Sequence, residues 1–240
     1  MIMALTDALA AGEWKFTPEV TAEFDEHVQQ SVPHYAEMQR MIAELSDWLV
    51  PDGGTIADLG ASTGTTIDAI AQRHPARTIN AHLYDVEKHM LDAARDKLAK
   101  HSKLKANYHT TNICRELKHR EADLTIASLT IQFLTDAQRH DALDRARFHS
   151  RKAGTLVLVE KVRQDHSEWQ DIAAELTQER KALAGLSDKE IRDKQAAIRG
   201  VLRPHTTGHI VNELHASGWD EIDEVWRWHN WCMLVAKSQR

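Results

Sequence analysis

The stretch from Thr55 to Gly64 constrains the fold of this chain more than any other, because it joins a short buried strand directly to a turn of small residues. The turn follows the pattern Gly-x-Ser-x-Gly over Gly60–Gly64, and a helical pattern begins immediately after it. Small residues leave such a turn open, so that a bulky polar ligand can approach the backbone closely. The stretch therefore predicts a nucleotide-type binding site at the end of a parallel strand.

Two acids flank this turn. Asp58 precedes it, and Asp85 follows Gly64 by about twenty residues, at the end of the next apolar alternation. In α/β nucleotide sites, an acid at the second place accepts hydrogen bonds from ribose hydroxyls. No Lys-Ser or Lys-Thr pair follows the turn, which excludes a phosphate-binding P-loop. The pattern points to S-adenosylmethionine (SAM). The alternatives are a tight turn without a ligand and, for Asp58, a role only in ordering the loop.

The composition indicates the cellular compartment of the protein and the kinds of partner that it can bind. The net charge of −6, with the 15 histidines counted as neutral, argues against extended binding of nucleic acid. Two distant cysteines, Cys114 and Cys232, suit a reducing compartment and match neither a disulfide framework nor a zinc knuckle. We find no pattern of a secretory leader and no apolar window of membrane-spanning length. We therefore expect a cytoplasmic protein with no membrane partner.

Hydrophobic periodicity predicts an α/β architecture. Residues 1–50 are expected to form an N-terminal helical extension, broken at Pro33, and residues 51–240 the ligand-binding domain. Strands are expected at 55–59, 78–84, 107–110, 123–128 and 154–161, and in a closing antiparallel hairpin over 221–237. Helices are expected at 65–74, 87–100, 135–151 and 207–217, with a helical insertion over about 165–203 that covers the ligand mouth. Such parallel sheets bind ligands at the carboxyl ends of their strands, where the turn and Asp85 both fall.

Five segments carry a family resemblance that extends from Phe24 to Lys237. They are Gln30–Tyr35 (QSVPHY), Asp58–Gly64 (DLGASTG), Leu129–Leu134 (LTIQFL), Leu156–Lys161 (LVLVEK) and Leu234–Lys237 (LVAK). The chain resembles the class I SAM-dependent methyltransferases. Within them it is most similar to the carboxy-S-adenosylmethionine synthase family, which serves wobble-uridine modification of tRNA. The resemblance implies a Rossmann-like, seven-stranded fold with N-terminal helices and a helical insertion after the fifth strand.

The resemblance also implies which residues hold SAM. Gly60 to Ser62 would pack under the methionine part, and Asn112 with Ile113 would hold the adenine. Asp85 would take the ribose hydroxyls, and Tyr35 would close over the site. The whole predicted cofactor set is Tyr35, Asp58, Gly60, Ala61, Ser62, Gly64, Asp85, Val86, Asn112, Ile113 and Ser128.

Three positions depart from the family pattern. Asn112 replaces an Asp, Ser128 replaces an Asn, and Gln195 replaces the Arg that lets the family hold a carboxylated sulfonium. Gln195 can donate a hydrogen bond to a carboxylate but cannot neutralise its charge. If the segment 187–201 is helical, Arg192 and Arg199 share a face with Gln195, and either could restore a cation. All three are substrate-side candidates.

The expected function is methyl transfer from SAM to an acceptor that the sequence does not identify, with S-adenosylhomocysteine as product and no general base assigned. Orientation and exclusion of water supply most of the rate of such a transfer. The first alternative is synthesis of carboxy-SAM, with prephenate as the source of the carboxyl group. The second is a non-catalytic SAM-binding protein, which the three departures leave open. The resemblance and the tryptophan-rich C-terminal end indicate a homodimer.

Several further patterns are interpreted as structural. Trp226 and Trp228 face one side of a strand, as core or interface residues commonly do. His205 and His209 lie four residues apart in the sequence. No metal is expected there, because we find no cysteine or acid nearby to complete a metal shell. The charged run over 136–151 is interpreted as a solvated helix face. Glu160 and Lys161 end the strongest strand, where a catalytic role and a packing role both remain open.

Overall fold

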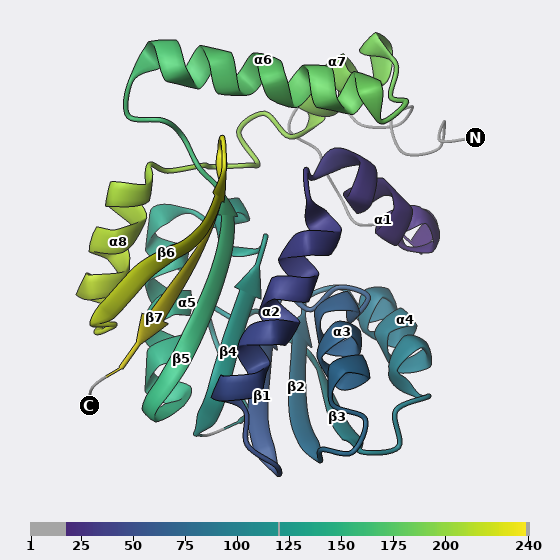
Figure 1. Ribbon diagram of the computed structural model, residues 1–240, viewed down its shortest axis with the longest axis vertical. Coiled ribbons are helices and arrows are strands. Elements are labelled where there is room, and N and C mark those ends of the chain that lie inside the picture. The colour runs from purple at the N-terminus through teal and green to yellow at the C-terminus, as the bar shows by residue number, and fades with distance from the viewer. Residues whose placement is uncertain (1–17, 120, 239–240) are drawn as a thin grey trace.

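The structure, a computed structural model, describes residues 18–119 and 121–238 and is built around one seven-stranded sheet (Figure 1). The strand order is β3-β2-β1-β4-β5-β7-β6. The first five strands in this order are parallel, and β7 runs antiparallel to both of its neighbours. The strands are β1 (Gly54–Leu59), β2 (Ile79–Asp85), β3 (Leu104–Thr110), β4 (Ala122–Ser128), β5 (Ser150–Lys161), β6 (Glu221–Trp228) and β7 (Trp231–Lys237). The predicted α/β class is confirmed, including the parallel sheet and the closing antiparallel hairpin.

Helices cover both faces of this sheet (Figure 1). On one face, α2 (Tyr35–Leu49), α3 (Thr65–Arg73) and α4 (Lys88–Leu98) pack into the first buried apolar cluster. On the other face, α5 (Asp136–His149) and α8 (Thr207–Ala216) pack into the second. The central strands are buried on both sides, and β4 is buried along nearly its whole length, including its polar residues Asp123 and Thr125.

Three helices lie beyond the carboxyl ends of the parallel strands (Figure 1). They are α1 (Pro18–Ser31), α6 (Ser167–Leu183) and α7 (Asp188–Ala197). The predicted insertion over about 165–203 therefore consists of α6 and α7. No helix among the described residues has the length and apolar character needed to cross a membrane.

Local signals place most element boundaries correctly. Thr135 and Ser187 both form the capping boxes expected of them. The helix that follows Ser187 is shorter than predicted, however, because α7 ends at Ala197 and Arg199 lies in the turn beyond it. Residues 1–17 of the predicted N-terminal extension lie outside the described residues, and a division at residue 50 stays a prediction.

Arg139 corrects the interpretation of 136–151 as a solvated face. Its side chain is fully buried and joins two acids from other elements. The guanidinium donates to Glu160 of β5 at 3.0 and 3.1 Å, and to Glu213 of α8 at 2.7 to 3.0 Å. Glu160, which is itself fully buried, therefore has a structural role in this ion-pair network rather than a place in a binding pocket.

Replacing Arg139 by methionine will lower the free energy of unfolding by about 3–5 kcal/mol, because Glu160 and Glu213 would keep carboxylates in a buried site without a counter-charge. The measurement is urea unfolding followed by circular dichroism. Lys88→Met is the control, since Lys88 pairs with Asp92 on the surface and such a pair contributes about 1 kcal/mol at most. Equal effects of the two substitutions would show that the Arg139 network does not stabilise the fold.

Candidate functional site

A pocket opens at the carboxyl ends of the parallel strands, beneath α1, α6 and α7. Its volume of about 330 Å³ lies in the range of small-molecule sites. The strand order reverses between β1 and β4, and the loops that follow these two strands both line the pocket. This is the switch point at which open α/β sheets bind their ligands.

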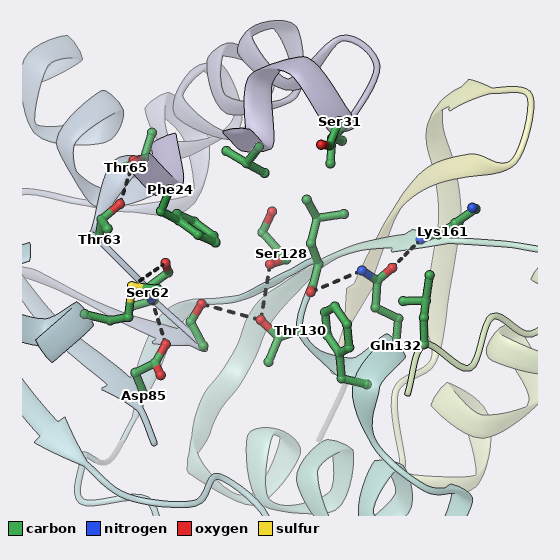
Figure 2. A pocket seen from close by; sticks show the side chains of 18 of the residues that line it. Phe24, Ser31, Ser62, Thr63, Thr65, Asp85, Ser128, Thr130, Gln132 and Lys161 are labelled. Carbon is green, nitrogen blue, oxygen red and sulfur yellow. Dashed lines mark hydrogen bonds between the residues drawn. The ribbon is translucent and has the colours of Figure 1, made fainter. Parts of the chain in front are cut away.

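The glycine turn after β1 forms the floor of this pocket (Figure 2). The backbone N–H groups of Gly60 and Ala61 both donate to the carbonyl of Tyr84 at the end of β2, at 2.8 and 2.9 Å. Ser62 has a positive φ of 48°, so the turn bends sharply before α3 begins. Two adjacent strand ends thus hold the turn in one conformation, and they leave its small residues facing the pocket.

Gly60 has no room for a side chain. Its φ is +82°, and a Cβ atom there would lie 2.2 Å from Oγ1 of Thr130. Thr130 is itself held in place, because its hydroxyl donates to the carbonyl of Ser128 at 3.2 Å (Figure 2). The predicted role of Gly60 in a close backbone approach is consistent with this geometry.

Gly60→Ala is therefore expected to lower the free energy of unfolding by about 2–5 kcal/mol, since it combines left-handed strain with a steric clash. Gly53→Ala is a matched control, because Gly53 has a similar φ of +77° but open space around it. Gly53→Ala should lower the free energy of unfolding by about 1–2 kcal/mol, because it introduces backbone strain without a clash. Urea unfolding of both variants measures the difference, and an equal loss in both would contradict the proposed clash with Thr130.

Asp85 lies at the end of β2 and points to the turn (Figure 2). Its Oδ2 accepts from the N–H of Ser62 at 2.9 Å, and its Oδ1 accepts from the N–H of Glu87 at 3.0 Å. Burial raises the pKa of this carboxyl group, and the hydrogen bonds from these backbone groups oppose the rise. Asp85 thus fixes the turn and keeps further acceptor capacity for ligand hydroxyls.

Asp58 lies beneath the turn and does not line the pocket. Its side chain is buried, its Oδ2 has no hydrogen-bond partner among the described residues, and burial together with nearby Asp85 raises its pKa to about 7. Gly64 likewise lies outside the lining, at the start of α3. An unpartnered buried acceptor beside the pocket fits a ligand that brings a cation or a hydrogen-bond donor close to it.

α1 covers the turn from above. Asp25 of α1 accepts from the hydroxyl of Thr63 at 2.6 Å and from Lys97 of α4 at 2.5 Å. Phe24 of the same helix and Tyr35 of α2 line the pocket, and burial raises the pKa of the Tyr35 hydroxyl. The predicted closure over the site by Tyr35 is therefore supported by its position, and α1 contributes to the same cover.

The remaining predicted cofactor residues lie together on the adjacent strand ends. Val86 follows β2, Asn112 and Ile113 follow β3, and Ser128 ends β4, and all four line the pocket. Asn112 Oδ1 accepts from the N–H of Cys114 at 2.8 Å, which fixes the loop after β3. Val86 is 59% exposed, so an apolar ligand surface could cover it.

Three lysines line the same pocket, and the sequence analysis singled out only Lys161, with a catalytic and a packing role both open. They come from three elements: Lys161 ends β5, Lys181 lies on α6 and Lys194 on α7. Burial lowers the pKa of Lys161, and burial with the charge of Lys161 lowers that of Lys181 to about 8. No local motif marks these lysines as a group, because they are twenty and thirteen residues apart in sequence.

Their surroundings leave two of these lysines without a counter-charge. Among the described residues, the ion pairs of lysine involve neither Lys161 nor Lys181. Lys161 lies over the indole of Trp231, 5.7 Å from the ring centroid. Asp85, at the opposite part of the lining, is the one acid among the described residues that line the pocket. This part of the wall therefore carries positive charge toward the pocket.

Lys194 connects the insertion to α1. Its Nζ donates to Oγ of Ser31 at 2.6 Å and to Nε2 of His27 at 2.5 Å. Burial and the charges of Lys194 and Lys181 lower the pKa of His27 to about 3, so His27 is neutral and can accept this hydrogen bond. The positions of α7 and α1 over the pocket are thereby coupled.

The predicted substrate-side residues lie elsewhere. Gln195, Arg192 and Arg199 do not line the pocket, although Gln195 directly follows Lys194. The prediction that Arg192 or Arg199 supplies a cation to this pocket does not match the structure, because Arg192 is exposed and Arg199 lies beyond the end of α7. The cations that reach the pocket are lysines.

Comparison with known proteins agrees with this geometry. The sequence profile of a methyltransferase domain matches residues 57–156, the part that carries the glycine turn and Asp85. Carboxy-S-adenosyl-L-methionine synthase of Methylococcus capsulatus is 32% identical over 227 residues, which cover 93% of each chain. The enzyme of the same name from Campylobacter lari is 27% identical over 224 residues, 93% of this chain and 94% of its own.

Solved structures share the fold at low identity. An O-methyltransferase family protein from Burkholderia thailandensis aligns with a TM-score of 0.64 and 16% identity, over 91% of this chain and 59% of the other. Human N-acetylserotonin methyltransferase, solved in complex with SAM, aligns with a TM-score of 0.63 and 13% identity, over 93% of this chain and 57% of the other. The chain thus spans less than two thirds of the length of these solved proteins.

Proposed function

The chain belongs to the carboxy-S-adenosyl-L-methionine synthase family of class I SAM-dependent methyltransferases, and we propose from this that it transfers a carboxyl group to SAM. SAM as cofactor and the Rossmann-like fold follow from the family, as predicted. The sequence alone favours methyl transfer to an unidentified acceptor and gives carboxyl transfer as its first alternative. The lysines Lys161 and Lys181, which line the pocket, favour carboxyl transfer instead.

The observation that carries the proposal is the pair of unpaired ammonium groups of Lys161 and Lys181 in the pocket. A buried cation without a counter-charge is costly to the fold, and an anionic ligand offsets that cost. The product carries a carboxylate beside the sulfonium, and its carboxyl donor, prephenate by the family resemblance, is also an acid. A methyl acceptor would not in general require these charges.

The predicted residues fit SAM in this pocket. Asp85 would accept from the ribose hydroxyls, and the turn from Gly60 to Ser62 would lie against the methionine part. Asn112 and Ile113 would hold the adenine. SAM would supply a methyl group whose protons the sulfonium makes acidic. A bond from the methyl carbon to the carboxyl carbon would replace one of its C–H bonds, while in prephenate the C–C bond to that carboxyl group breaks and the ring hydroxyl leaves as water with the methyl proton.

The helices above the pocket contribute by excluding water. α1, α6 and α7 cover the strand ends, and hydrogen bonds from Lys194 to Ser31 and His27 couple two of them. Lys161 and Lys181 would orient the carboxylates of the donor against the methyl group, so that its carboxyl group is released next to the atom that takes it up.

Native mass spectrometry of the purified protein, followed by identification of the released ligand, tests this proposal. We expect a ligand heavier than SAM by the mass of one CO₂, or its formation after incubation with SAM and prephenate. SAM or S-adenosylhomocysteine alone, with no carboxylated product after that incubation, would overturn the proposal and return methyl transfer to first place. Bound SAM with no turnover on any substrate would favour the non-catalytic alternative.

We further propose a homodimer in the cytoplasm. Trp169, Ile172 and Leu183 of α6 are 59, 38 and 82% exposed and lie on one side of the helix. Large apolar side chains that gather on a surface commonly mark an interface. Both cysteines are free and buried, which suits a reducing compartment. Light scattering should give twice the chain mass for the wild type and the single chain mass for Leu183→Glu; a monomeric wild type would contradict the dimer.

A further inference from the structure

A second group of chemically active side chains lies outside the pocket, around the start of α8. His205, His209 and Glu213 each offer one ligand atom, and these atoms all lie within 4.8 Å of one another. Asp136, at the start of α5, places its Oδ1 3.3 Å from Nε2 of His205. The sequence analysis expected no acid beside these histidines, and this expectation is wrong, because one helical turn brings Glu213 next to His209 and the fold adds Asp136.

Two distances between neighbouring ligand atoms match those around a tetrahedral metal ion. Zinc bonds to nitrogen and oxygen of about 2.0–2.2 Å place neighbouring ligand atoms about 3.3–3.6 Å apart. His205 Nε2 and Asp136 Oδ1 are 3.3 Å apart, and His209 Nε2 and Glu213 Oε1 are 3.6 Å apart. The two imidazole rings are nearly parallel, with centroids 4.2 Å apart, and each has a nitrogen among the clustered ligand atoms.

One of these atoms lacks a partner. Nε2 of His205 is buried and has no hydrogen-bond partner among the described residues. A buried imidazole nitrogen that makes no hydrogen bond is available to bind a metal ion.

The charges around the group favour a dication. Three carboxylates lie here, those of Asp136, Glu213 and Glu160, and Arg139 supplies one positive charge to the last two. Net negative charge therefore remains when the histidines are neutral, even though burial raises the pKa of Glu160 to about 7. Oε1 of Glu213 accepts a hydrogen bond from Arg139 and still has a second lone pair for a metal ion, because a carboxylate oxygen can accept more than one contact.

We propose that His205, His209, Glu213 and Asp136 form a binding site for a divalent transition-metal ion, with zinc as the best match. Two imidazoles and two carboxylates are a ligand set that zinc accepts in tetrahedral geometry. None of the four residues lines the pocket, so the role would be structural: the ion would join the start of α8 to the start of α5. This site is independent of the proposed reaction.

Isothermal titration of the chelator-treated protein with zinc chloride at neutral pH tests the proposal. We expect one ion per chain, a rise in Tm on addition of zinc, and no such rise with magnesium, which prefers all-oxygen sites. His209→Gln should weaken zinc binding at least tenfold. His140→Gln is the matched control, because His140 also lies four residues before an acid on an exposed helix face, and it should bind zinc as the wild type does.

Two results would overturn the site. One is the absence of stoichiometric zinc binding to the wild type. The other is unchanged zinc affinity in both His209→Gln and a second variant, Asp136→Asn, which leaves Arg139 and its buried partners intact. Glu213 is not a suitable test position, since its loss would also disturb the Arg139 ion pairs.

Discussion

Asp85→Ala will weaken the binding of SAM about 100-fold or more while the protein stays folded. The substitution removes a carboxylate that would accept from two ribose hydroxyls, and each hydrogen bond to a charged group contributes about 1.5–3 kcal/mol. It also removes the acceptor of the Ser62 and Glu87 N–H groups, so the turn that faces the methionine part loses its support. Calorimetric titration with SAM measures the affinity.

Asp92→Ala is the control for this prediction. Asp92 is an acid on α4 that pairs with Lys88 and Arg95 on the surface, outside the pocket. Its removal should leave the affinity for SAM unchanged. The SAM affinity of Asp85→Asn should lie between those of Asp85→Ala and Asp92→Ala, since its amide oxygen still accepts one hydrogen bond. An affinity of Asp85→Ala equal to that of the wild type would show that the ribose site has been placed wrongly.

Lys181→Met will lower kcat/KM for carboxyl transfer at least about 30-fold, because truncating one partner of a buried charge contact costs about 2 kcal/mol or more. The same substitution should not destabilise the fold. Lys181 is 7% exposed and has no ion-pair partner among the described residues, so an apolar side chain of similar length removes a desolvation cost. We therefore expect a Tm equal to or above that of the wild type.

The measurements are carboxy-SAM formation by mass spectrometry and thermal unfolding by calorimetry. Lys189→Met is the control, because Lys189 lies on α7 with 71% of its side chain exposed and pairs with Asp193. The control should change neither activity nor SAM affinity. Full activity of Lys181→Met would refute the anion-binding role, whereas a lower Tm together with lost SAM binding would indicate a structural role instead.

The elements of the fold could be predicted because their signals are local. Thr135 and Ser187 cap helices with partners three residues away, and apolar alternation marks β1 and β2 within single segments. The start of β3 was predicted at residue 107 and lies at Leu104, because its edge position leaves its residues only partly buried and its pairing with β2 decides its length. The end of α7 was placed too late because the first glycine after Ser187 is Gly200, three residues beyond the last helical residue, Ala197.

The sequence by itself determined the α/β class, the glycine turn and the acid at Asp85, since a strand, a turn and the next strand end suffice to bring these together. Only the tertiary structure decided which cations face the pocket and where Arg139 lies. Lys161, Lys181 and Lys194 meet because β5, α6 and α7 converge over the strand ends, and Arg139 reaches Glu213 across 74 residues. Such contacts depend on the packing of whole elements, and the spacing within one segment carries no information about them.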